Sequence, residues 1–555
     1  MRKFTSIFLA AVLVSSLTAC KGGETSIVKD WDNTEHTHEC TKVIAKDPTC
    51  LKEGNTEYWS CFGCDNIYQD QAMTKQLSLQ DVMIPKLSHA ITAVDAEAST
   101  CAQNGHEAYW YCSNCFTYFS DAEGKKYIAD KGDVVLDTTA HALVHQQATS
   151  PAGFTNGNIE HWSCVDCDAR YLDEKGFQKT TKEATVVLSS YNIVDFVVEV
   201  PVGENPIVLQ LTDTQIIDAG QARPGRGGVD HNFWATDKMD ERCYDYITEV
   251  VNATNPHLIL LTGDIIYGEF DDNGTALTKF INFMDSLQIP WAPIFGNHEN
   301  ESAMGADWQC EQLENARYCL FEQKTLTGNG NYSVAIAQDG EIKRAFYMLD
   351  SNGCGAASSQ SLANGHTQTA IGFGQDQIDW YTQEITALKA VAPDTKISFA
   401  YHIQGAIFEQ AFAQYGFNQA VKEQNINIDR LTDKASTDFG HIGRQLKNPW
   451  DADYSVFNGM KALGADSIFV GHEHCNSASV VYEGVRFQFG QKSSEYDRFN
   501  YLYADGSISS DNGANATSLM GGTVIPLSNV DGSIVNPYIY YCGYPNGQIN
   551  WSQFH

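Results

Sequence analysis

The sequence is poor in basic residues. Lys and Arg together number 36 against 69 Asp and Glu, which gives the 555-residue chain a formal charge of −33 at pH 7. So large an excess of negative charge repels a nucleic-acid backbone or a broad anionic surface unless a local basic patch compensates. We therefore expect no nucleic-acid polymer as a partner, whereas a small anionic substrate is compatible with this composition.

Long apolar runs are also scarce. Only residues 4–17 form one, and this run is shorter than the roughly 20 residues that cross a bilayer as a helix. It follows the basic start Met1-Arg2-Lys3 and ends at Leu17-Thr18-Ala19-Cys20, which resembles a bacterial lipobox. We predict a lipoprotein signal peptide over residues 1–19 and lipidation of Cys20. The lipid would then be the only membrane anchor of a protein of the cell envelope, outside the cytoplasm. An ordinary secretory signal is the alternative.

A polar tether, residues 20–35, leads into an internal repeat with a period of 51 to 52 residues. The first two copies place ligand-type residues at identical spacing, namely His38, Cys50, Cys61 and Cys64 in one and His89, Cys101, Cys112 and Cys115 in the other. The third copy has Gly153 in place of the middle cysteine. We predict three small modules over residues 36–86, 87–138 and 139–181. They resemble short cysteine-containing repeats on surface proteins of Gram-positive anaerobes.

Zinc accounts for this pattern better than disulfides do. A Cys-x-x-Cys pair with one more Cys and one His is the ligand set of a structural zinc site. Three cysteines cannot pair evenly within one copy, and the histidine has no role in a disulfide. Disulfides stay the alternative because the protein is expected outside the cytoplasm. We predict one Cys₃His site within each of the first two copies and lost or weakened binding in the third. A spacer role is favoured over ligand binding.

From residue 182 the pattern changes to alternating strands and helices, which predicts an α/β sheet. Five apolar runs are each followed at once by Asp, Asn or His. Ligands and catalytic groups collect at the carboxyl ends of strands in such sheets. We therefore assign residues 182–555 to one catalytic domain, and its strand-like runs are 206–213, 257–267, 289–295, 396–402 and 466–474.

The side chains at these strand ends form a set of metal ligands. Oxygen and imidazole donors without thiolate suit a hard or borderline metal ion. A shared Asp with separate ligands on either side suggests two ions, about 3.5–4 Å apart in hydrolytic sites.

Five motifs in order carry a family resemblance. They are Asp213-x-Gln215, Gly263-Asp264, Gly296-Asn297-His298-Glu299, His402 and Gly471-His472-Glu473-His474. This set resembles the calcineurin-like metallophosphoesterases, which implies a four-layer α-β-β-α sandwich. The resemblance implies that Asp264 bridges two metal ions. Asn297, His402 and His472 would complete one site, and Asp213 and His474 would serve the other. It also implies that His298 acts on the substrate as a general acid or a phosphate-stabilising group.

One position departs from the common family pattern. Gln215 stands where the family usually has a metal-binding His two residues after the first Asp. Purple acid phosphatases, a branch of the same superfamily, also lack that His and use a Tyr three residues after the bridging Asp, where this chain has Tyr267. We interpret Tyr267 as the replacement ligand, which would favour Fe(III) beside a divalent Fe, Zn or Mn. In the alternative, Tyr267 only packs and Gln215 or water fills the place.

The function that follows is hydrolysis of small phosphoesters. The resemblance implies attack on phosphorus by a metal-bound hydroxide, with the metal ions and His298 stabilising the phosphoryl oxygens. The alternative is a surface ligand-binding protein whose phosphoesterase domain is inactive, which the Gln215 departure would permit.

Overall fold

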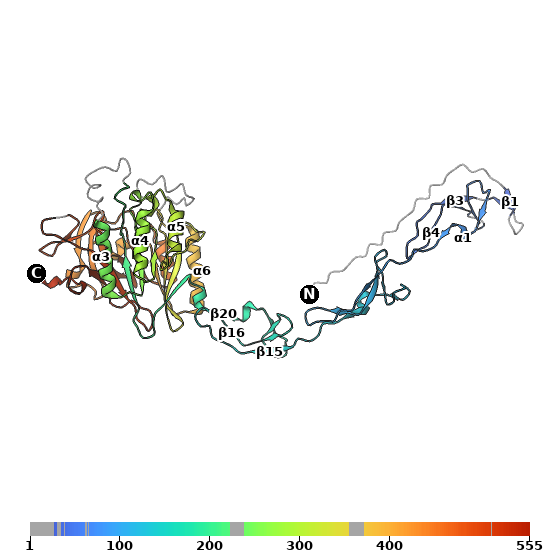
Figure 1. Cartoon of the computed structure of the whole chain (residues 1–555), viewed down its shortest axis with the longest axis horizontal. Helices are drawn as coiled ribbons and strands as arrows, with labels where there is room; N and C mark the ends of the chain where they lie inside the picture. The colour runs from blue at the N-terminus through green and yellow to red at the C-terminus, as the bar shows by residue number, and fades with distance from the viewer. Residues whose placement is uncertain are drawn as a thin grey trace. The chain divides into compact units, whose positions relative to one another are not determined.

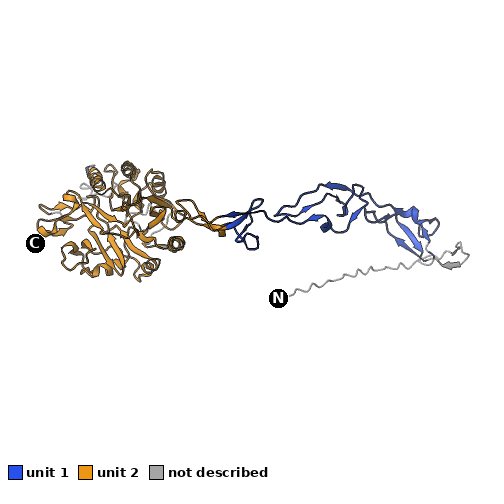
Figure 2. Cartoon of the chain, turned by 90° about the horizontal axis from the view of Figure 1, so that it is seen from below, with its two compact units in different colours: residues 1–146, 161–182 blue, residues 147–160, 183–555 orange. Residues whose placement is uncertain are grey.

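The computed structural model describes residues 27–29, 35–37, 39–61, 64, 66–221, 238–353, 371–511 and 513–554. The predicted signal peptide, Cys20 and His38 lie outside the described residues. Among the helices in these ranges, none combines the length and the apolar character that a membrane crossing requires. Two compact units make up the chain, residues 1–146 with 161–182 and residues 147–160 with 183–555 (Figure 2).

Each copy of the repeat builds the same four-stranded antiparallel sheet. The second strand of each sheet ends on the first cysteine of the Cys-x-x-Cys pair. Each copy also contains a separate two-stranded antiparallel ribbon. The sheets are β3 (Cys40–Val43), β5 (Tyr58–Cys61), β6 (Ile67–Tyr68) and β7 (Gln76–Leu77); β9 (Ile91–Val94), β11 (Tyr109–Cys112), β12 (Tyr118–Phe119) and β13 (Tyr127–Ile128); and β15 (Leu143–Gln146), β17 (His161–Cys164), β18 (Arg170–Tyr171) and β19 (Lys179–Thr180). The ribbons are β4 (Gly54–Asn55) with β8 (Met83–Ile84), β10 (Gly105–His106) with β14 (Val135–Leu136), and β16 (Gly157–Asn158) with β20 (Val186–Val187). Strands β1 (Ile27–Lys29) and β2 (Glu35–Thr37) pair ahead of them.

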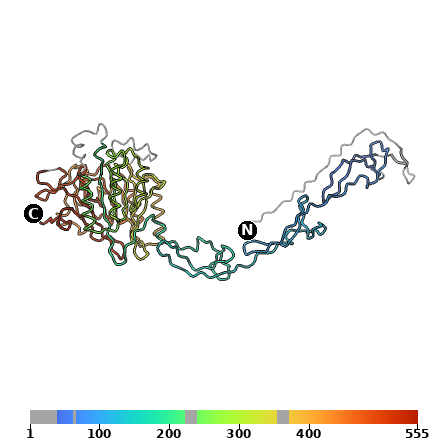
Figure 3. Tube along the Cα trace, viewed as in Figure 1, coloured from blue at the N-terminus to red at the C-terminus, as the bar shows by residue number. Residues whose placement is uncertain are grey.

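The second unit contains two large sheets. The nine-stranded sheet runs in the order β21 (Phe196–Glu199), β25 (Tyr332–Gln338), β26 (Glu341–Met348), β27 (Lys396–Ala400), β30 (Ala465–Val470), β32 (Val485–Phe489), β31 (Asn476–Tyr482), β29 (Phe439–Arg444) and β28 (Glu423–Asn427). The five-stranded sheet runs β24 (Trp291–Pro293), β23 (Leu258–Leu261), β22 (Ile207–Leu211), β36 (Gly521–Pro526) and β37 (Tyr538–Tyr541). Strand β36 runs antiparallel to β22, so residues near the C-terminus extend this sheet. They are drawn in red beside green segments in Figure 3.

Helices cover the outer face of each sheet (Figure 1). On the five-stranded sheet, α3 (Lys238–Thr254) packs on β36, and Phe280 of α4 (Thr275–Ser286) meets Trp291 of β24. Helix α5 (Ala306–Asn315) packs beside α4. On the nine-stranded sheet, α6 (Gln375–Val391) sets Trp380 against Tyr347 of β26, while α7 (Ile407–Ala413) and α8 (Ser455–Ala462) lie on β31 and β30. The predicted four-layer α-β-β-α sandwich is confirmed.

The inner faces of the two sheets meet through apolar side chains and through polar bridges, one of which is made by Gln210. Strand β23 is Leu-Ile-Leu-Leu with all four residues buried, as expected for a parallel strand covered on both faces. Gln210 of β22 donates to the carbonyl oxygen of Val470 at 3.0 Å and accepts from Gln488 at 2.8 Å. Because a buried amide must find partners, these bonds fix how β22 lies against β30 and β32. The same edge carries the candidate site.

Candidate metal centre

The five predicted strand ends meet at one place. Asp213 follows β22, Asp264 follows β23 and Asn297 follows β24, which are parallel neighbours in one sheet. His402 follows β27, and the loop with His472 and His474 follows β30, its parallel neighbour in the other sheet. Carboxyl ends of parallel strands share an edge, and the two sheets bring their edges together here.

Two groups of potential metal ligands share one carboxylate. Asp264, His402 and His472 offer ligand atoms that all lie within 4.8 Å of one another, and Asp213, Asp264 and His474 do the same. Nε2 of His402 lies 3.2 Å from Oδ2 of Asp264, and Nε2 of His474 lies 3.1 Å from Oδ1 of Asp213. The structure therefore gathers these five residues around Asp264, the residue that the family resemblance makes the bridge.

Several atoms that face this centre make no hydrogen bond within the protein. The buried side-chain atoms that make no hydrogen bond in the described part of the chain include five at this centre: Oδ1 of Asp213, Oδ2 of Asp264, Oδ1 of Asn297, and Nε2 of His402 and of His472. An unsatisfied buried polar atom is costly, and here all five lie on predicted metal ligands. Carboxylate, amide oxygen and imidazole are the donors that divalent and trivalent ions of this class accept. The donor set therefore fits two metal ions.

The backbone at the centre is held in an uncommon conformation. Asp213, Asp264 and His472 have φ values of 50°, 52° and 70°, in the left-handed region that costs energy for residues other than Gly. Gly263 is required by close approach, since a Cβ there would lie 2.6 Å from Nδ1 of His402. Strain of this kind persists only where the surrounding fold enforces it, as the strand ends do here.

The electrostatics favour ionised carboxylates. Burial alone would raise the pKa of Asp213, but the neighbouring His474 outweighs it and lowers the pKa to about 2. Burial opposes ionisation of Asp264 as well, yet His402 and His298 hold its pKa well below the usual range. Burial lowers the pKa of His402, and Asp264 overcomes this and raises it to about 10. The carboxylates beside His402 thus favour a positive charge at this place, which a bound metal cation would supply.

The metal-facing histidines are oriented from behind. Nδ1 of His402 lies 2.7 Å from the carbonyl oxygen of Thr262, to which it donates when Nε2 faces the centre. Nδ1 of His474 lies 2.9 Å from Asp497. A metal-ligating His generally donates its other N–H to an oxygen in this way, which fixes the tautomer and the ring plane. Asp497 has no signal in the sequence beyond its place in the polar run 491–498.

His298 lies beside the centre and pairs with the carboxylate of Glu301. Its Nδ1 lies 2.6 Å from Glu301, and its Nε2 lies 3.8 Å from Oδ2 of Asp264. Burial lowers the pKa of His298, but Asp264 and Glu301 outweigh it and raise the pKa to about 9. Glu299 accepts from the backbone N–H groups of Gly296 at 2.6 Å and of Ile265, so it ties the loop after β24 to the loop after β23. Sequence analysis included Glu299 in a motif without a role and did not single out Glu301, although each lies within three residues of His298.

Gln215 occupies the place of the missing histidine and has a different partner. Its Oε1 accepts from Nζ of Lys492 at 2.8 Å, and the same ammonium donates to the carbonyl oxygen of Asp213 at 2.8 Å. Both side chains are fully buried or nearly so. A buried cation beside Asp213 was not predicted, and no pattern around Lys492 signals it. The amide oxygen of Gln215 is thus turned to Lys492.

Tyr267 lies next to His298, at the start of the short 3₁₀ turn Gly268–Phe270. Its ring stacks on the imidazole of His298 with centroids 4.1 Å apart and meets Phe270 edge-on at 5.6 Å. The tyrosine is buried at the margin of the centre. The contact with His298 is the packing role of the alternative interpretation, and the role as an iron ligand stays a prediction.

The cysteines and histidines of the repeat also gather, but not within one copy. Cys50 of the first copy lies with His89, Cys112 and Cys115 of the second, and Cys101 of the second lies with His141, Cys164 and Cys167 of the third. The expected grouping of Cys50 with Cys61 and Cys64, and of Cys101 with Cys112 and Cys115, is therefore wrong. The middle cysteine lies on a hairpin tip that reaches the following copy.

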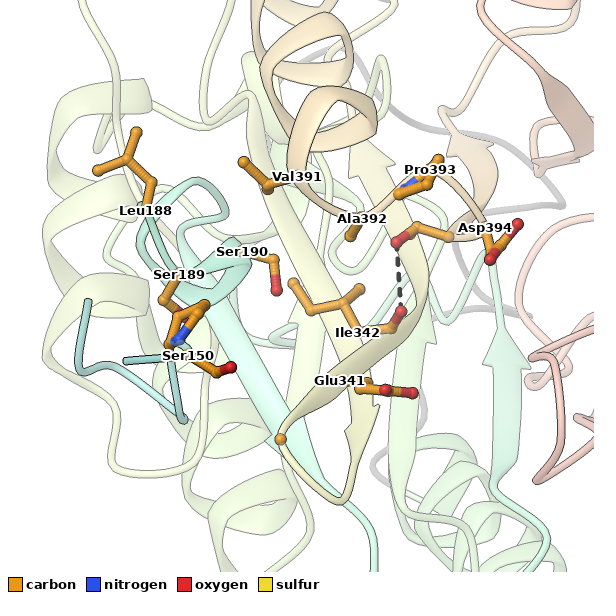
Figure 4. Close-up of a pocket in the computed structure, with 13 residues that line it drawn as sticks. Ser150, Leu188, Ser189, Ser190, Glu341, Ile342, Val391, Ala392, Pro393 and Asp394 are labelled. Carbon is orange, nitrogen blue, oxygen red and sulfur yellow. Dashed lines mark hydrogen bonds between the residues drawn. The ribbon is translucent and has the colours of Figure 1, made fainter. Parts of the chain in front are cut away.

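A separate hollow of about 370 Å³ lies at the opposite end of the nine-stranded sheet (Figure 4). Ser150, Ser189 and Ile342 line it, together with Thr395 just before β27 begins. It is thus near the amino end of the strand whose carboxyl end leads to His402. Its lining holds neither His nor Cys, and we assign it no catalytic role.

Comparison with protein families finds one match. Residues 207–476 match the family described as Calcineurin-like phosphoesterase. This span begins at β22 and ends two residues after His474, so it contains every residue of the metal centre named above except Lys492 and Asp497.

Individual relatives are distant. The chain is 24% identical over 262 residues to the phosphatase DCR2 of Saccharomyces cerevisiae, which covers 43% of this chain and 39% of that protein. It is 25% identical over 267 residues to the probable inactive purple acid phosphatase 29 of Arabidopsis thaliana, with 44% and 61% covered. The chain thus spans less than two thirds of either protein. Among solved structures, a dimetal phosphatase from Danio rerio aligns with 60% of this chain and 98% of its own, at 10% identity and a TM-score of 0.33. The purple acid phosphatase PPD1 of yellow lupin aligns with 88% and 79%, at 10% identity and a TM-score of 0.30.

Proposed function

We propose that the chain is a binuclear metal-dependent hydrolase of small phosphoesters, lipid-anchored outside the cytoplasm. Residues 207–476, which match the calcineurin-like phosphoesterase family, would form its catalytic part. The observation that carries the catalytic part is the pair of ligand groups that share Asp264. The localisation rests on the sequence 17–20, and the choice of a small substrate rests on the charge of −33.

The residues divide the work by position. Asp264 would bridge the two ions, His402, His472 and Asn297 would hold one, and Asp213 and His474 would hold the other. Bound ions would supply Lewis-acid polarisation of phosphoryl oxygens and would lower the pKa of a coordinated water. We include iron in the proposal because Tyr267 would be one of the ligands, and a tyrosine ligand would favour Fe(III).

His298 would act on the substrate rather than on the metals. Glu301 holds its Nδ1 at 2.6 Å, which leaves Nε2 directed to the side of Asp264. A proton on Nε2 can be donated to a phosphoryl oxygen or to the leaving alkoxide as charge develops there. Tyr267 stacks on the ring and limits its rotation.

A catalytically inactive binding domain is the second candidate. One observation favours it, namely that Gln215 replaces a usual ligand and is held by Lys492. A relative named as a probable inactive purple acid phosphatase shows that such domains occur near this sequence. Against it, the other predicted ligands are all present, and five of them form two groups that share Asp264.

The test combines metal analysis with hydrolysis of two aryl phosphates. Purified wild-type protein, assayed with p-nitrophenyl phosphate and bis-p-nitrophenyl phosphate, should hydrolyse at least one of them and so identify a monoesterase or a diesterase. Asp264→Asn should lose the bound metal of the catalytic centre and lower kcat by at least about 10³-fold, because it removes the bridging charge. Asp379→Asn, an exposed residue on α6, is the matched control and should behave as wild type. A protein that holds two metal ions yet hydrolyses neither ester would support the binding-protein alternative.

A further inference from the structure

The hairpin tip that carries the middle cysteine has the same geometry in all three copies. The backbone N–H of Thr49 donates to the carbonyl oxygen of Lys52 at 2.8 Å, and Thr100 donates to Gln103 in the same way at 2.9 Å. In the third copy, Ala152 donates to Thr155 at 2.9 Å. The residue after the first member of each pair is Cys50, Cys101 or Gly153. The tip is therefore one structural device used three times.

Each of the first two tips is bound to the segment that opens the following copy. Leu87 donates its N–H to the carbonyl oxygen of Thr49 at 3.1 Å, two residues before His89. Thr139 donates to Thr100 at 3.0 Å, two residues before His141. These backbone bonds place the cysteine of one copy against the histidine of the next.

The four side chains at each junction have the separations of a tetrahedral site. Sγ of Cys50 lies 4.0 Å from Sγ of Cys112, and Sγ of Cys115 lies 3.3 Å from Nδ1 of His89. At the next junction, the Cys101–Cys164 and Cys167–His141 distances are 3.6 and 3.4 Å. Zn–S bonds of about 2.3 Å and Zn–N bonds of about 2.0 Å at tetrahedral angles give separations of roughly 3.8 and 3.5 Å. All six of these cysteines are free thiols.

Packing and backbone donors support the same sites. Cys50 is buried in a small cluster with Cys112 and Phe119, although 62 residues separate the two cysteines. The backbone N–H groups of Asn114 and Cys115 point to the sulfur of Cys112, and the N–H of Asp166 points to Cys164. N–H groups directed at sulfur stabilise a thiolate, which is the form that binds metal.

The third tip shows why its cysteine is dispensable. No fourth copy follows, and the tip packs instead on residues 189–192 of its own unit. Gly153 accepts a hydrogen bond at its carbonyl oxygen from Ser189, and the ring of Phe154 meets Tyr191 edge-on at 5.3 Å. Asn156 accepts from the N–H of Ser189 at 2.9 Å. Direct packing on a larger domain thus replaces the metal at the last junction.

The first copy shows the complementary change. No tip precedes it in the described residues, and it carries Cys40, which lies opposite Cys61 across the β3–β5 pair. The corresponding residue of the second copy is Ile91, which packs against the Cys50–Cys112 cluster. Because His38 lies outside the described residues, only the two complete groups enter the inference.

We propose that the repeat region binds two zinc ions at the junctions between copies, each held by the middle cysteine of one copy and by the histidine and the Cys-x-x-Cys pair of the next. The ligand sets are Cys50, His89, Cys112 and Cys115, and Cys101, His141, Cys164 and Cys167. Each ion joins two modules that have little core of their own, so the copies form one metal-linked segment and not three independent zinc domains.

The test is a zinc count on paired cysteine variants of the full-length protein. Cys50→Ser and Cys112→Ser should each lose one zinc per chain, and the double variant should lose no more, because both residues serve one ion. Cys101→Ser with Cys112→Ser should lose two. Sites contained within single copies predict the reverse, with two ions lost from the first pair and one from the second. Zinc bound at the catalytic centre cancels, since every value is a difference from wild type.

Two further measurements separate metal binding from misfolding. Cys50→His replaces one zinc ligand by another and should retain the ion. A general loss of folding would instead release the ion from both Cys50→His and Cys50→Ser. Cobalt substitution should give sulfur-to-metal absorption that falls by about half in Cys50→Ser and in Cys101→Ser. If denatured wild-type protein shows no free thiols among these six cysteines and the variants leave the zinc count unchanged, the junctions are disulfides and the proposal is overturned.

Discussion

Glu301 holds the imidazole of His298 through a contact of 2.6 Å between its carboxylate and Nδ1. Nε2 of the same ring lies 3.8 Å from Oδ2 of Asp264, on the side of the metal centre. The carboxylate therefore selects the tautomer and ring orientation that directs Nε2 to the place of a substrate. The glutamate is buried and belongs to neither group of potential metal ligands, so we interpret it as a positioning residue.

Replacing Glu301 should separate positioning from metal binding. Glu301→Gln should lower kcat about 10- to 100-fold with the metal content unchanged, because an outer carboxylate that orients a catalytic His typically contributes this much. His298→Ala should lower kcat at least as far, and adding Glu301→Gln to it should have little further effect. Glu311→Gln, exposed on α5, is the control. Additive losses in the double variant would show that Glu301 acts independently of His298.

Tyr267→Phe tests the iron proposal. The ring and its stacking on His298 remain while the phenolic oxygen is removed, so a change in the spectrum reports on that oxygen. We expect the wild-type protein to contain iron and a visible absorption band, and the variant to lose the band. If iron is present and the band survives in Tyr267→Phe, the tyrosine packs on His298 and does not bind the metal.

Lys492 and Gln215 should depend on each other for stability. Lys492→Met leaves the amide oxygen of Gln215 and the carbonyl oxygen of Asp213 without their donor, and Gln215→Leu deprives a buried ammonium of an acceptor. Each change should lower the free energy of unfolding by about 2–4 kcal/mol. The double variant should lose less than the sum, by about 1–3 kcal/mol. Denaturant unfolding of the metal-free proteins measures this cycle, and additive losses would contradict the coupling.

Glu384 on α6 should make the stability of the catalytic unit depend on pH. Burial, reinforced by the charge of Asp195, raises the pKa of Glu384 to about 7. The folded state then holds a proton that the unfolded state releases near the ordinary value of about 4.3, so stability falls as pH rises from about 4.5 to 7. Glu384→Gln should therefore be more stable than wild type at pH 8, on the order of 2 kcal/mol, and differ little at pH 4.5.

Thermal unfolding at both pH values measures this effect. Asp379→Asn removes one negative charge from the exposed side of the same helix and serves as the control. A Glu384→Gln protein whose gain in Tm is the same at pH 4.5 and at pH 8 would show that the substitution acts through packing.

Metal removal should loosen the junctions of the repeat. If zinc joins Cys50 to the second copy, a chelator should raise the rate of tryptic cleavage after the exposed Lys86 by about tenfold or more, because local opening then costs less free energy. Added zinc should restore the slow rate. Cys50→Ser should be cleaved fast without chelator, and Cys101→Ser, which affects the other junction, should match wild type at Lys86. Equal rates in Cys50→Ser and wild type would contradict a metal at the first junction.

Much of the catalytic centre could be predicted from the sequence, because the rule that places it is local. Asp213, Asp264 and His402 each follow an apolar strand directly, and parallel strands in an α/β sheet end at a common edge. The position of each residue directly after a strand therefore predicts that these residues, far apart in the sequence, lie close together in the fold. Apolar strands that alternate with helical segments also predicted an α/β sheet, since each element must bury one face against another layer. The four-layer arrangement was implied by the family resemblance.

Two kinds of contact could not be predicted from local sequence, namely the hydrogen bonds around the metal centre and the cysteine groups that join the copies. Both bring together residues that are far apart in the sequence. Lys492 reaches Gln215 across 277 positions of the chain, and only the meeting of the two sheets brings a buried ammonium to that amide. Spacing within one copy placed Cys50 with Cys61, because residues near in sequence are the default partners. The hairpin tip instead projects the cysteine into the next copy, to Cys112. The ligand types were readable from the sequence, whereas their pairing required the fold, because distance along the chain does not measure distance in space.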